Sequence, residues 1–141
     1  MGCMDERIFN VWVIARPAPD LPGQWLAHCL DFDVVSQGGS LKDAMRMVHE
    51  AAVMVALDDL NSGRDPHERR APEEFFGELY GLFESGEKFS NAELEQAEND
   101  GRILAVATQF ELRFSRGGYD HDIVARTARP VPMAIAQQAC A

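Results

Sequence analysis

Apolar residues recur along the chain with a period of two in some stretches and at helical spacing in others. The period-two stretches predict strands at residues 8–15, 24–30, 34–37 and 102–114, with a return strand at 119–126. The first strand is rich in β-branched and aromatic residues, which favour a position buried on both sheet faces. Three prolines and Gly23 interrupt the pattern after it, so a hairpin loop joins the first two strands.

The helix that follows a Gly-Gly turn has the clearest start signal in the chain. Ser40 is a suitable N-cap, and Asp43 follows three residues later, an arrangement that resembles a capping box. Apolar residues then form one stripe at helical spacing: Leu41, Ala44, Met45, Val48, Ala51, Ala52, Val55 and Ala56. The pattern predicts a helix that packs on a sheet and ends near residues 60–62, before Gly63.

Residues 72–101 form an insert of two predicted helices before the later strands. Pro72 starts the first of these helices and Gly86 ends it. Its apolar residues share one face: Phe76, Leu79, Tyr80 and Phe83. Ser90 and Glu93 form a capping box that starts the second helix, which is short and polar.

The chain of 141 residues is expected to form a single domain, residues 1–141, with one core. We place the core in residues 8–62 and 102–126 and expect a loose tail at 127–141. No apolar run is long enough to cross a membrane, and the N-terminal residues lack the pattern of a secretory signal. Three widely spaced cysteines fit a reducing cytoplasm better than a disulfide framework or a zinc site: Cys3, Cys29 and Cys140.

The net charge of the chain favours some classes of binding partner over others. The net charge is −10, and residues 73–100 alone carry nine acids and one base. Such a surface repels phosphate backbones, which disfavours direct nucleic-acid binding and a helix-turn-helix reading of the two short helices. It suits a basic protein partner, although solubility alone also explains an acidic surface. We therefore select Glu74, Glu78 and Glu93 as candidates for a partner interface.

Two tryptophans on neighbouring predicted strands, Trp12 and Trp25, are candidates for either the core or an oligomer contact. Small sheets often protect an exposed edge by pairing with another copy. We therefore expect a homo-oligomer, most simply a two-fold dimer.

Residues able to carry chemistry gather near the end of the second strand. A histidine and two carboxylates, His28, Asp31 and Asp33, are able to hold a divalent metal or to act in a nuclease-like site. Alternation points His28 and Cys29 to opposite faces, however, and aspartates are typical turn residues, so the turn interpretation is favoured. Residues 119–122 (Tyr-Asp-His-Asp) are likewise read as a polar strand. The sequence predicts no catalytic residue, no metal ion and no cofactor.

A loop glycine, an aspartate corner and a Gly-Gly turn into a capped helix follow one another within residues 9–58. The residues concerned are Gly23, Asp31, Gln37, Gly38, Gly39, Ser40, Asp43, Ala44 and Glu50. In order and spacing they resemble the HicB-like antitoxin family. Gly39 stands where the family often has Asp or Glu, and Asp43 stands where it often has Glu.

The resemblance implies an α+β domain of β-β-β-α-β order, a reduced ribonuclease-H-like layout with the acidic helical insert before the last strands. It implies a non-enzymatic antitoxin that blocks a small basic toxin, itself an enzyme that cleaves messenger RNA. Many family members also carry a C-terminal DNA-binding domain that represses their operon, and no such domain is visible after Ser62. The alternative is a solitary HicB-like domain that binds a small ligand or a metal, or that keeps a degenerate nuclease site.

Overall fold

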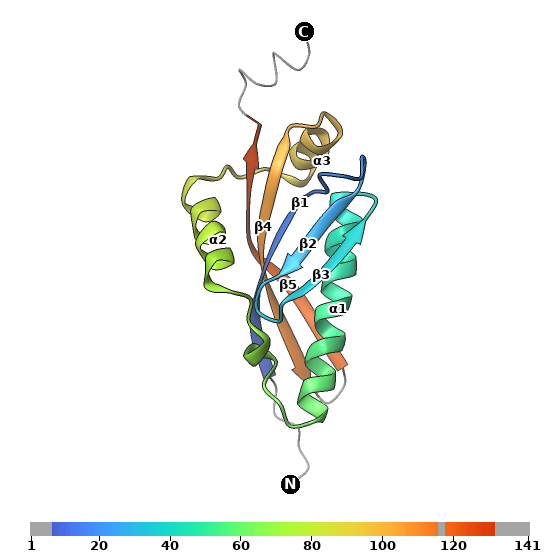
Figure 1. The fold of residues 1–141 in the computed structure, drawn as a ribbon, viewed down its shortest axis with the longest axis vertical. Coiled ribbons are helices and arrows are strands. Elements are labelled where there is room, and N and C mark those ends of the chain that lie inside the picture. Colours follow the sequence, from blue (N-terminus) through green and yellow to red (C-terminus); the bar gives the residue numbers. More distant parts are fainter. Residues whose placement is uncertain (1–6, 116–117, 132–141) are drawn as a thin grey trace.

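The computed structural model describes residues 7–115 and 118–131, which form an α+β fold around one five-stranded antiparallel sheet (Figure 1). Its strands are β1 (Arg7–Pro17), β2 (Trp25–Cys29), β3 (Val34–Gly38), β4 (Ile103–Ser115) and β5 (Gly118–Pro130). They lie side by side in the order β3-β2-β1-β4-β5, so that β1 is central and β3 and β5 are the edges. The predicted α+β class is confirmed.

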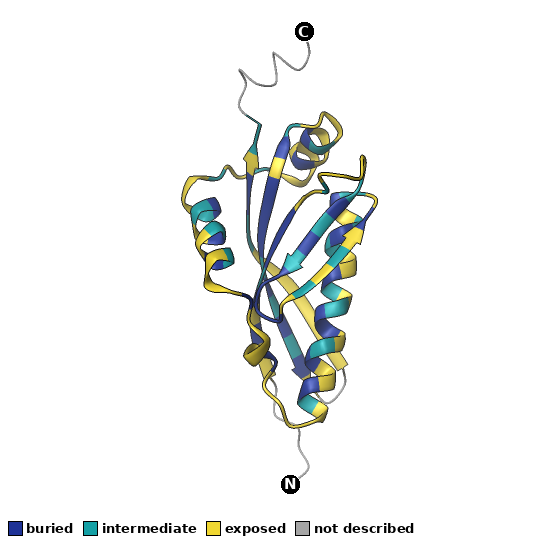
Figure 2. Cartoon of the chain, viewed as in Figure 1, coloured by how far each residue is buried: buried dark blue, intermediate teal, exposed yellow. Residues whose placement is uncertain are grey.

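Helices lie on both faces of the sheet. They are α1 (Leu41–Asn61), α2 (Glu73–Ser85), α3 (Asn91–Asn99) and the short 3-10 helix η1 (Pro66–Arg69). α1 and α3 pack on one face over the larger apolar core, and α2 packs on the other face over a smaller one. We call these the α1 face and the α2 face. Figure 2 shows the buried positions running along the strands beneath the helices.

The turn from β3 into α1 forms as a capped helix start. Ser40 Oγ accepts a hydrogen bond from the Asp43 backbone N at 3.0 Å, which confirms the predicted N-cap. The Asp43 carboxylate accepts its bond from the Gly39 backbone N at 3.2 Å, one residue earlier than a capping box requires. A Cβ atom on Gly38 would lie 2.4 Å from the Ala44 backbone N, so only glycine permits this close approach.

The insert contains the two predicted helices, with small corrections. α3 begins with a full capping box: the Glu93 backbone N donates to Ser90 Oγ at 3.2 Å, and the Ser90 backbone N donates to Glu93 Oε1 at 3.0 Å. α2 begins one residue later than predicted, with Pro72 as its N-cap. Tyr80, predicted on the packed face, is exposed, and Leu82 is buried in its place. The buried residues Phe76, Leu79 and Leu82 are spaced by three, and Tyr80 lies about 100° around the helix from Leu79, the centre of this face.

The two tryptophans lie on opposite faces of the sheet. Trp25 pairs with Pro17 and is buried in the α1-face core. Trp12 is half-buried on the α2 face, where its ring meets Phe83 edge-on with 5.3 Å between ring centroids. Of the two roles predicted for Trp25, core residue or oligomer contact, the structure shows the core role. The two tryptophan rings do not share a surface.

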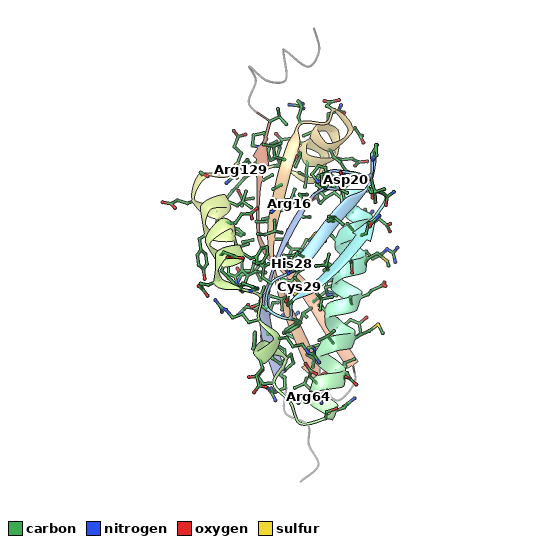
Figure 3. All side chains as sticks on the ribbon, viewed as in Figure 1. Arg16, Asp20, His28, Cys29, Arg64 and Arg129 are labelled. Carbon is green, nitrogen blue, oxygen red and sulfur yellow. The ribbon has the colours of Figure 1, made fainter. Side chains whose placement is uncertain are left out.

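A buried ion pair holds the polar loop that follows α1. The Asp59 side chain, in the last turn of α1, is 1% exposed, and its carboxylate accepts bonds from Arg69 Nε at 2.6 Å and Nη2 at 2.9 Å. Arg64 Nε lies 3.2 Å from the same carboxylate. These bonds, from Arg69 above all, favour the charged form and lower the pKa of Asp59 to about 2. Figure 3 shows Arg64 at this end of the molecule.

The last strand is longer than the sequence predicted. β5 continues to Pro130, and Thr127 and Ala128 are buried, so the expectation of a loose tail from residue 127 was wrong at its start. Ala128 exchanges two backbone hydrogen bonds, of 2.8 and 2.9 Å, with Glu87 in the α2–α3 linker (residues 86–90). This contact, between residues far apart in the sequence, fixes the strand end. Residues 132–141 lie outside the described part of the chain.

Candidate functional site

α1 leaves part of the face on which it packs uncovered. It lies over β1, β2 and β3, whereas β4 and β5 continue beside it. Two hollows of about 530 and 680 Å³ lie along this flank of the helix. They share Ser40, Lys42, Met45, Phe110 and Ile123, so they are one continuous depression, which we call the α1–β5 groove.

The groove has an apolar floor and an exposed wall. Phe110 of β4 is buried, whereas Tyr119 and Ile123 of β5 are 50% and 56% exposed. The latter two pair with Phe114 and Phe110 and so point to the α1 face. Tyr119, His121 and Ile123 thus form one exposed row along β5, and an exposed row with large apolar members is typical of surfaces that contact another molecule.

A pair of histidines closes one end of the groove. His49 of α1 and His121 of β5 lie with their ring centroids 3.9 Å apart. The His49 Nε2 atom is buried and has no hydrogen-bond partner among the described residues. Burial, and then the neighbouring His121, lower the pKa of His49 to about 4. His49 is therefore neutral near pH 7 and acts there as an aromatic wall.

The opposite side of β5 is acidic. Strand alternation points Asp120 and Asp122 to the α2 face, where both are exposed. Their carboxylates accept bonds from Arg113 Nη2 at 3.1 and 2.6 Å, and Glu111 accepts from Arg113 Nη1 at 2.7 Å. Three carboxylates around one guanidinium leave this patch with a net negative charge.

The outer edge of β5 is closed at one end and open at the other. Glu87 pairs with Ala128 and covers the edge near the C-terminal end of the strand. No described strand pairs with the outer edge of residues 119–125. Phe110 pairs with Ile123 and Gln109 with Ala125, so Val124 forms a bulge in this open stretch.

The chain matches no protein-family model, no curated protein and no solved structure. No helix in the described residues is both long and apolar enough to span a bilayer. What the chain does must therefore be inferred from the groove, the open edge and the distribution of charge.

The structure divides the predicted metal or nuclease residues between separate contacts. His28 Nε2 lies 2.7 Å from Asp33 Oδ1, and Asp33 adopts the left-handed φ of 51°. Asp31 instead accepts a bond from the Trp12 backbone N at 2.6 Å. Burial raises the pKa of Asp31, although that bond opposes the shift. Asp31 and Asp33 lie in the turn between β2 and β3, where the sequence placed them. The bonds differ from the expected bonds to their own backbone, because Asp31 binds β1 and Asp33 binds a side chain.

The remaining reactive candidates lack the surroundings that their chemistry needs. Cys29, labelled beside His28 in Figure 3, is fully buried, and burial raises the pKa of its thiol to about 12, so it is not a nucleophile near pH 7. In residues 119–122, the histidine points to the groove and the two aspartates point away from it. Within residues 7–115 and 118–131, no three His, Cys, Asp or Glu side chains are grouped so as to hold a metal ion.

Two of the three acids selected for a partner interface have contacts within the chain. Glu78 binds Arg16, and Glu93 caps α3. Glu74 is exposed. The acids of the insert therefore differ in how freely they meet a partner, and α2 presents Glu74 to solvent more openly than Glu78.

Sequence reasoning did not find the groove or the open edge. The groove walls come from α1 and β5, which are far apart in the chain, and the bare strip exists because α1 crosses only part of the sheet. The local signal was the alternation of acids with Tyr119, His121 and Ile123, which is typical of a strand with two different faces.

Proposed function

We propose that this chain is a binding protein of the HicB-like antitoxin type, which neutralises a small basic protein by covering its surface. The resemblance assigns the partner to the toxins that cleave messenger RNA. Covering the RNA-binding surface of such a toxin is sufficient to block it, so the chain itself needs no catalytic residue. A homodimer is part of the proposal, formed through surfaces other than the buried Trp25.

The observation that carries this proposal is the acidic insert. Residues 73–100 hold nine acids and one base, and exposed acids occur on α2, on the linker and on α3. Opposite charge steers a basic protein toward such a surface and raises its association rate. The same field repels a phosphate backbone, which argues against direct binding of nucleic acid.

The α1–β5 groove supports a protein partner over a small ligand. It is an open strip with an apolar floor and charged side chains at its rim, which is the composition of a protein–protein interface. The alternative, a solitary domain with a ligand or metal site at His28, Asp31 and Asp33, has less support, because those side chains already bond to each other or to the backbone.

Affinity capture followed by an activity assay tests the proposal. The native chain is used as bait in a lysate of its own cells at low salt, and the column is then washed at about 0.5 M salt, where exposed charge pairs are screened. Any small basic protein that is released is purified, and its cleavage of messenger RNA is measured with and without the chain. The proposal predicts cleavage that an equimolar amount of the chain suppresses.

A charge-matched pair of variants then asks whether the insert is responsible. One variant neutralises exposed acids of the insert, as Glu74→Gln, Glu84→Gln and Glu95→Gln, and the control neutralises exposed acids elsewhere, as Asp20→Asn, Asp58→Asn and Glu68→Gln. We expect association with the captured protein to slow about tenfold in the first variant and clearly less in the control. Equal slowing in both, or a captured protein whose activity the chain leaves unchanged, contradicts the proposal.

A further inference from the structure

We propose that the open edge of β5, residues 119–125, binds an extended segment of the basic partner protein as a sixth strand of the sheet. The segment has basic residues alternating with β-branched or aromatic ones. The class of partner rests on the proposed function, whereas the position of the segment rests on the edge, the groove and the charges of β5.

The backbone of β5 has outward-pointing hydrogen-bonding groups along this edge that no described strand pairs with. Ala128 directs its N–H and C=O outward to Glu87, so its pairing with Val106 is a non-hydrogen-bonded pair. Tyr119, His121 and Ile123 also pair with even-numbered residues of β4, so their N–H and C=O groups point outward in the same way. No described strand pairs with them from outside, and an added strand would bond them as Glu87 bonds Ala128. The His121 N–H, which donates to Asp120 Oδ1 at 2.8 Å in the free chain, would exchange that bond for one to the added strand.

On the α2 face, the added strand meets negative charge. Residues directly opposite one another in an antiparallel pair lie on the same face with neighbouring Cβ atoms. Asp120 and Asp122 are exposed there and share a single base, Arg113, with Glu111. Lysine or arginine at the opposing positions would supply the positive charge that this patch lacks.

On the α1 face, the added strand meets the groove. Its alternate residues would lie beside Tyr119, His121 and Ile123, next to the hollow of about 680 Å³ that these three side chains help to line. That hollow also has Met45 and Phe110 on its walls, so apolar side chains of the segment would be covered there. Backbone bonds, basic side chains on one face and apolar side chains on the other together define the segment.

A second copy of this chain fits the edge poorly. Antiparallel pairing of β5 with itself about His121 would set Asp120 opposite Asp122 of the other copy, and like charges directly opposite are destabilising. The other edge strand, β3, has five residues and no basic side chain to offer. The same acids that discourage self-association, as charges do on many edge strands, favour a basic segment.

Titration with synthetic peptides tests the inference on the intact chain. The probe is the labelled peptide Lys-Val-Lys-Ile-Lys-Val-Lys, about as long as the open edge. One control peptide replaces every lysine by glutamate. A second control keeps the lysines but carries N-methyl groups on the backbone nitrogens of both its edges. The methyl groups remove strand pairing without changing the charge of the peptide. Binding is followed by anisotropy and by the amide resonances of the chain.

We expect the lysine peptide to bind and to shift resonances of residues 119–125, and neither control peptide to bind. Asp120→Asn with Asp122→Asn should weaken binding about three- to tenfold, whereas the matched variant Asp20→Asn with Glu68→Gln, which neutralises exposed acids outside both β5 and the insert, should leave it unchanged. Equal binding of the N-methylated peptide, absence of binding by the lysine peptide, or unchanged affinity in the Asp120/Asp122 variant overturns the inference.

The two proposals fail separately. If a basic toxin is captured and suppressed but its affinity is unaffected by the Asp120/Asp122 variant, the proposed function stands and the β5 edge is not the docking site. If the edge binds the lysine peptide but no toxin is captured, the docking site stands and the antitoxin role fails.

Discussion

The two halves of β5 belong to one strand and pair with one partner, β4, yet they differ in almost every other respect. Residues 126–130 are mostly buried or half-buried, lie next to α2 and the α2–α3 linker, and bond to Glu87 across their outer edge. Residues 118–124 are all exposed, and no described strand covers their edge (Figure 2). We call these the closed half and the open half.

The difference comes from neighbours rather than from the strand itself. The closed half has small residues that allow the linker to approach, such as Thr127 and Ala128, whereas the open half alternates acids with large apolar side chains. A strand that only needed to complete the sheet would be expected to hide those side chains or to be short. The open half therefore has the character of a binding surface, and the closed half that of a structural support.

Truncating one large side chain beside the closed half and one in the open half should give the largest difference in the free energy of unfolding. Leu82→Ala empties a fully buried site where α2 packs on the sheet, and we expect it to lower the free energy of unfolding by about 2–5 kcal/mol. Ile123→Ala removes a side chain that is 56% exposed, and the expected loss is below about 1 kcal/mol. Urea denaturation measures both, and similar losses would remove the distinction between the halves.

Substitution of a glycine in the α2–α3 linker should destabilise the packing of the linker against the closed half. A Cβ atom on Gly86 would lie 2.2 Å from Thr127 Oγ1 and 2.4 Å from the Leu82 backbone O, so Gly86→Ala should cost about 1–3 kcal/mol. Gly77→Ala in α2 meets no atom within 4 Å and should instead stabilise by about 0.5–1 kcal/mol. If the linker is packed as described, thermal unfolding should show a lower melting temperature for Gly86→Ala and a higher one for Gly77→Ala than for the native chain.

Lowering the pH should destabilise the fold through His49, which lines the groove beside the open half. The pKa of His49 is about 4 in the folded chain and near 6.5 in the unfolded chain, so the unfolded state binds the proton more readily between these values. Stability should therefore fall as the pH is lowered from about 6.5 to about 4. His49→Phe should reduce this loss in a series of urea denaturation curves. An unchanged pH dependence in that variant would mean that His49 is not buried against His121.

Charge on the open half should matter least for stability. Asp120 and Asp122 are exposed and bind the same guanidinium, that of Arg113, which keeps Glu111 as a partner when both are neutralised. Asp120→Asn with Asp122→Asn should leave the melting temperature within about 2 °C of the native value, because exposed ion pairs contribute little. Calorimetry checks this, and a large drop would make the acids part of the fold rather than part of a contact surface.

The same contrast explains what the sequence could predict. Local signals were accurate: Ser40 caps α1, Ser90 and Glu93 form a capping box, and Gly86 ends α2, because each depends on bonds between close neighbours in the chain. The end of β5 was placed too early, since Thr127 and Ala128 are held by a linker that the strand pattern does not reveal.

The candidate site was harder to foresee than the fold. The pattern of residues 119–122 indicated a polar strand but not what lay beside it, because the groove depends on how far α1 extends across the sheet. His28, Asp31 and Asp33 are near one another in sequence, yet Asp31 points to the backbone of β1 and the other two bind each other. Proximity along a turn does not determine which way the carboxylates point.

Hydrogen exchange of the β5 amides, measured by NMR on the free chain and with the lysine peptide bound, tests the central claim most directly. The account predicts that the outward-pointing amides of Tyr119 and Ile123 exchange fast in the free chain and at least about tenfold more slowly in the complex. The amide of His121 already donates to Asp120 Oδ1 and is left out of this comparison. The amide of Ala128 should be protected in both states. Slow exchange of the Tyr119 and Ile123 amides in the free chain, or new protection confined to α2 and α3, would contradict the account.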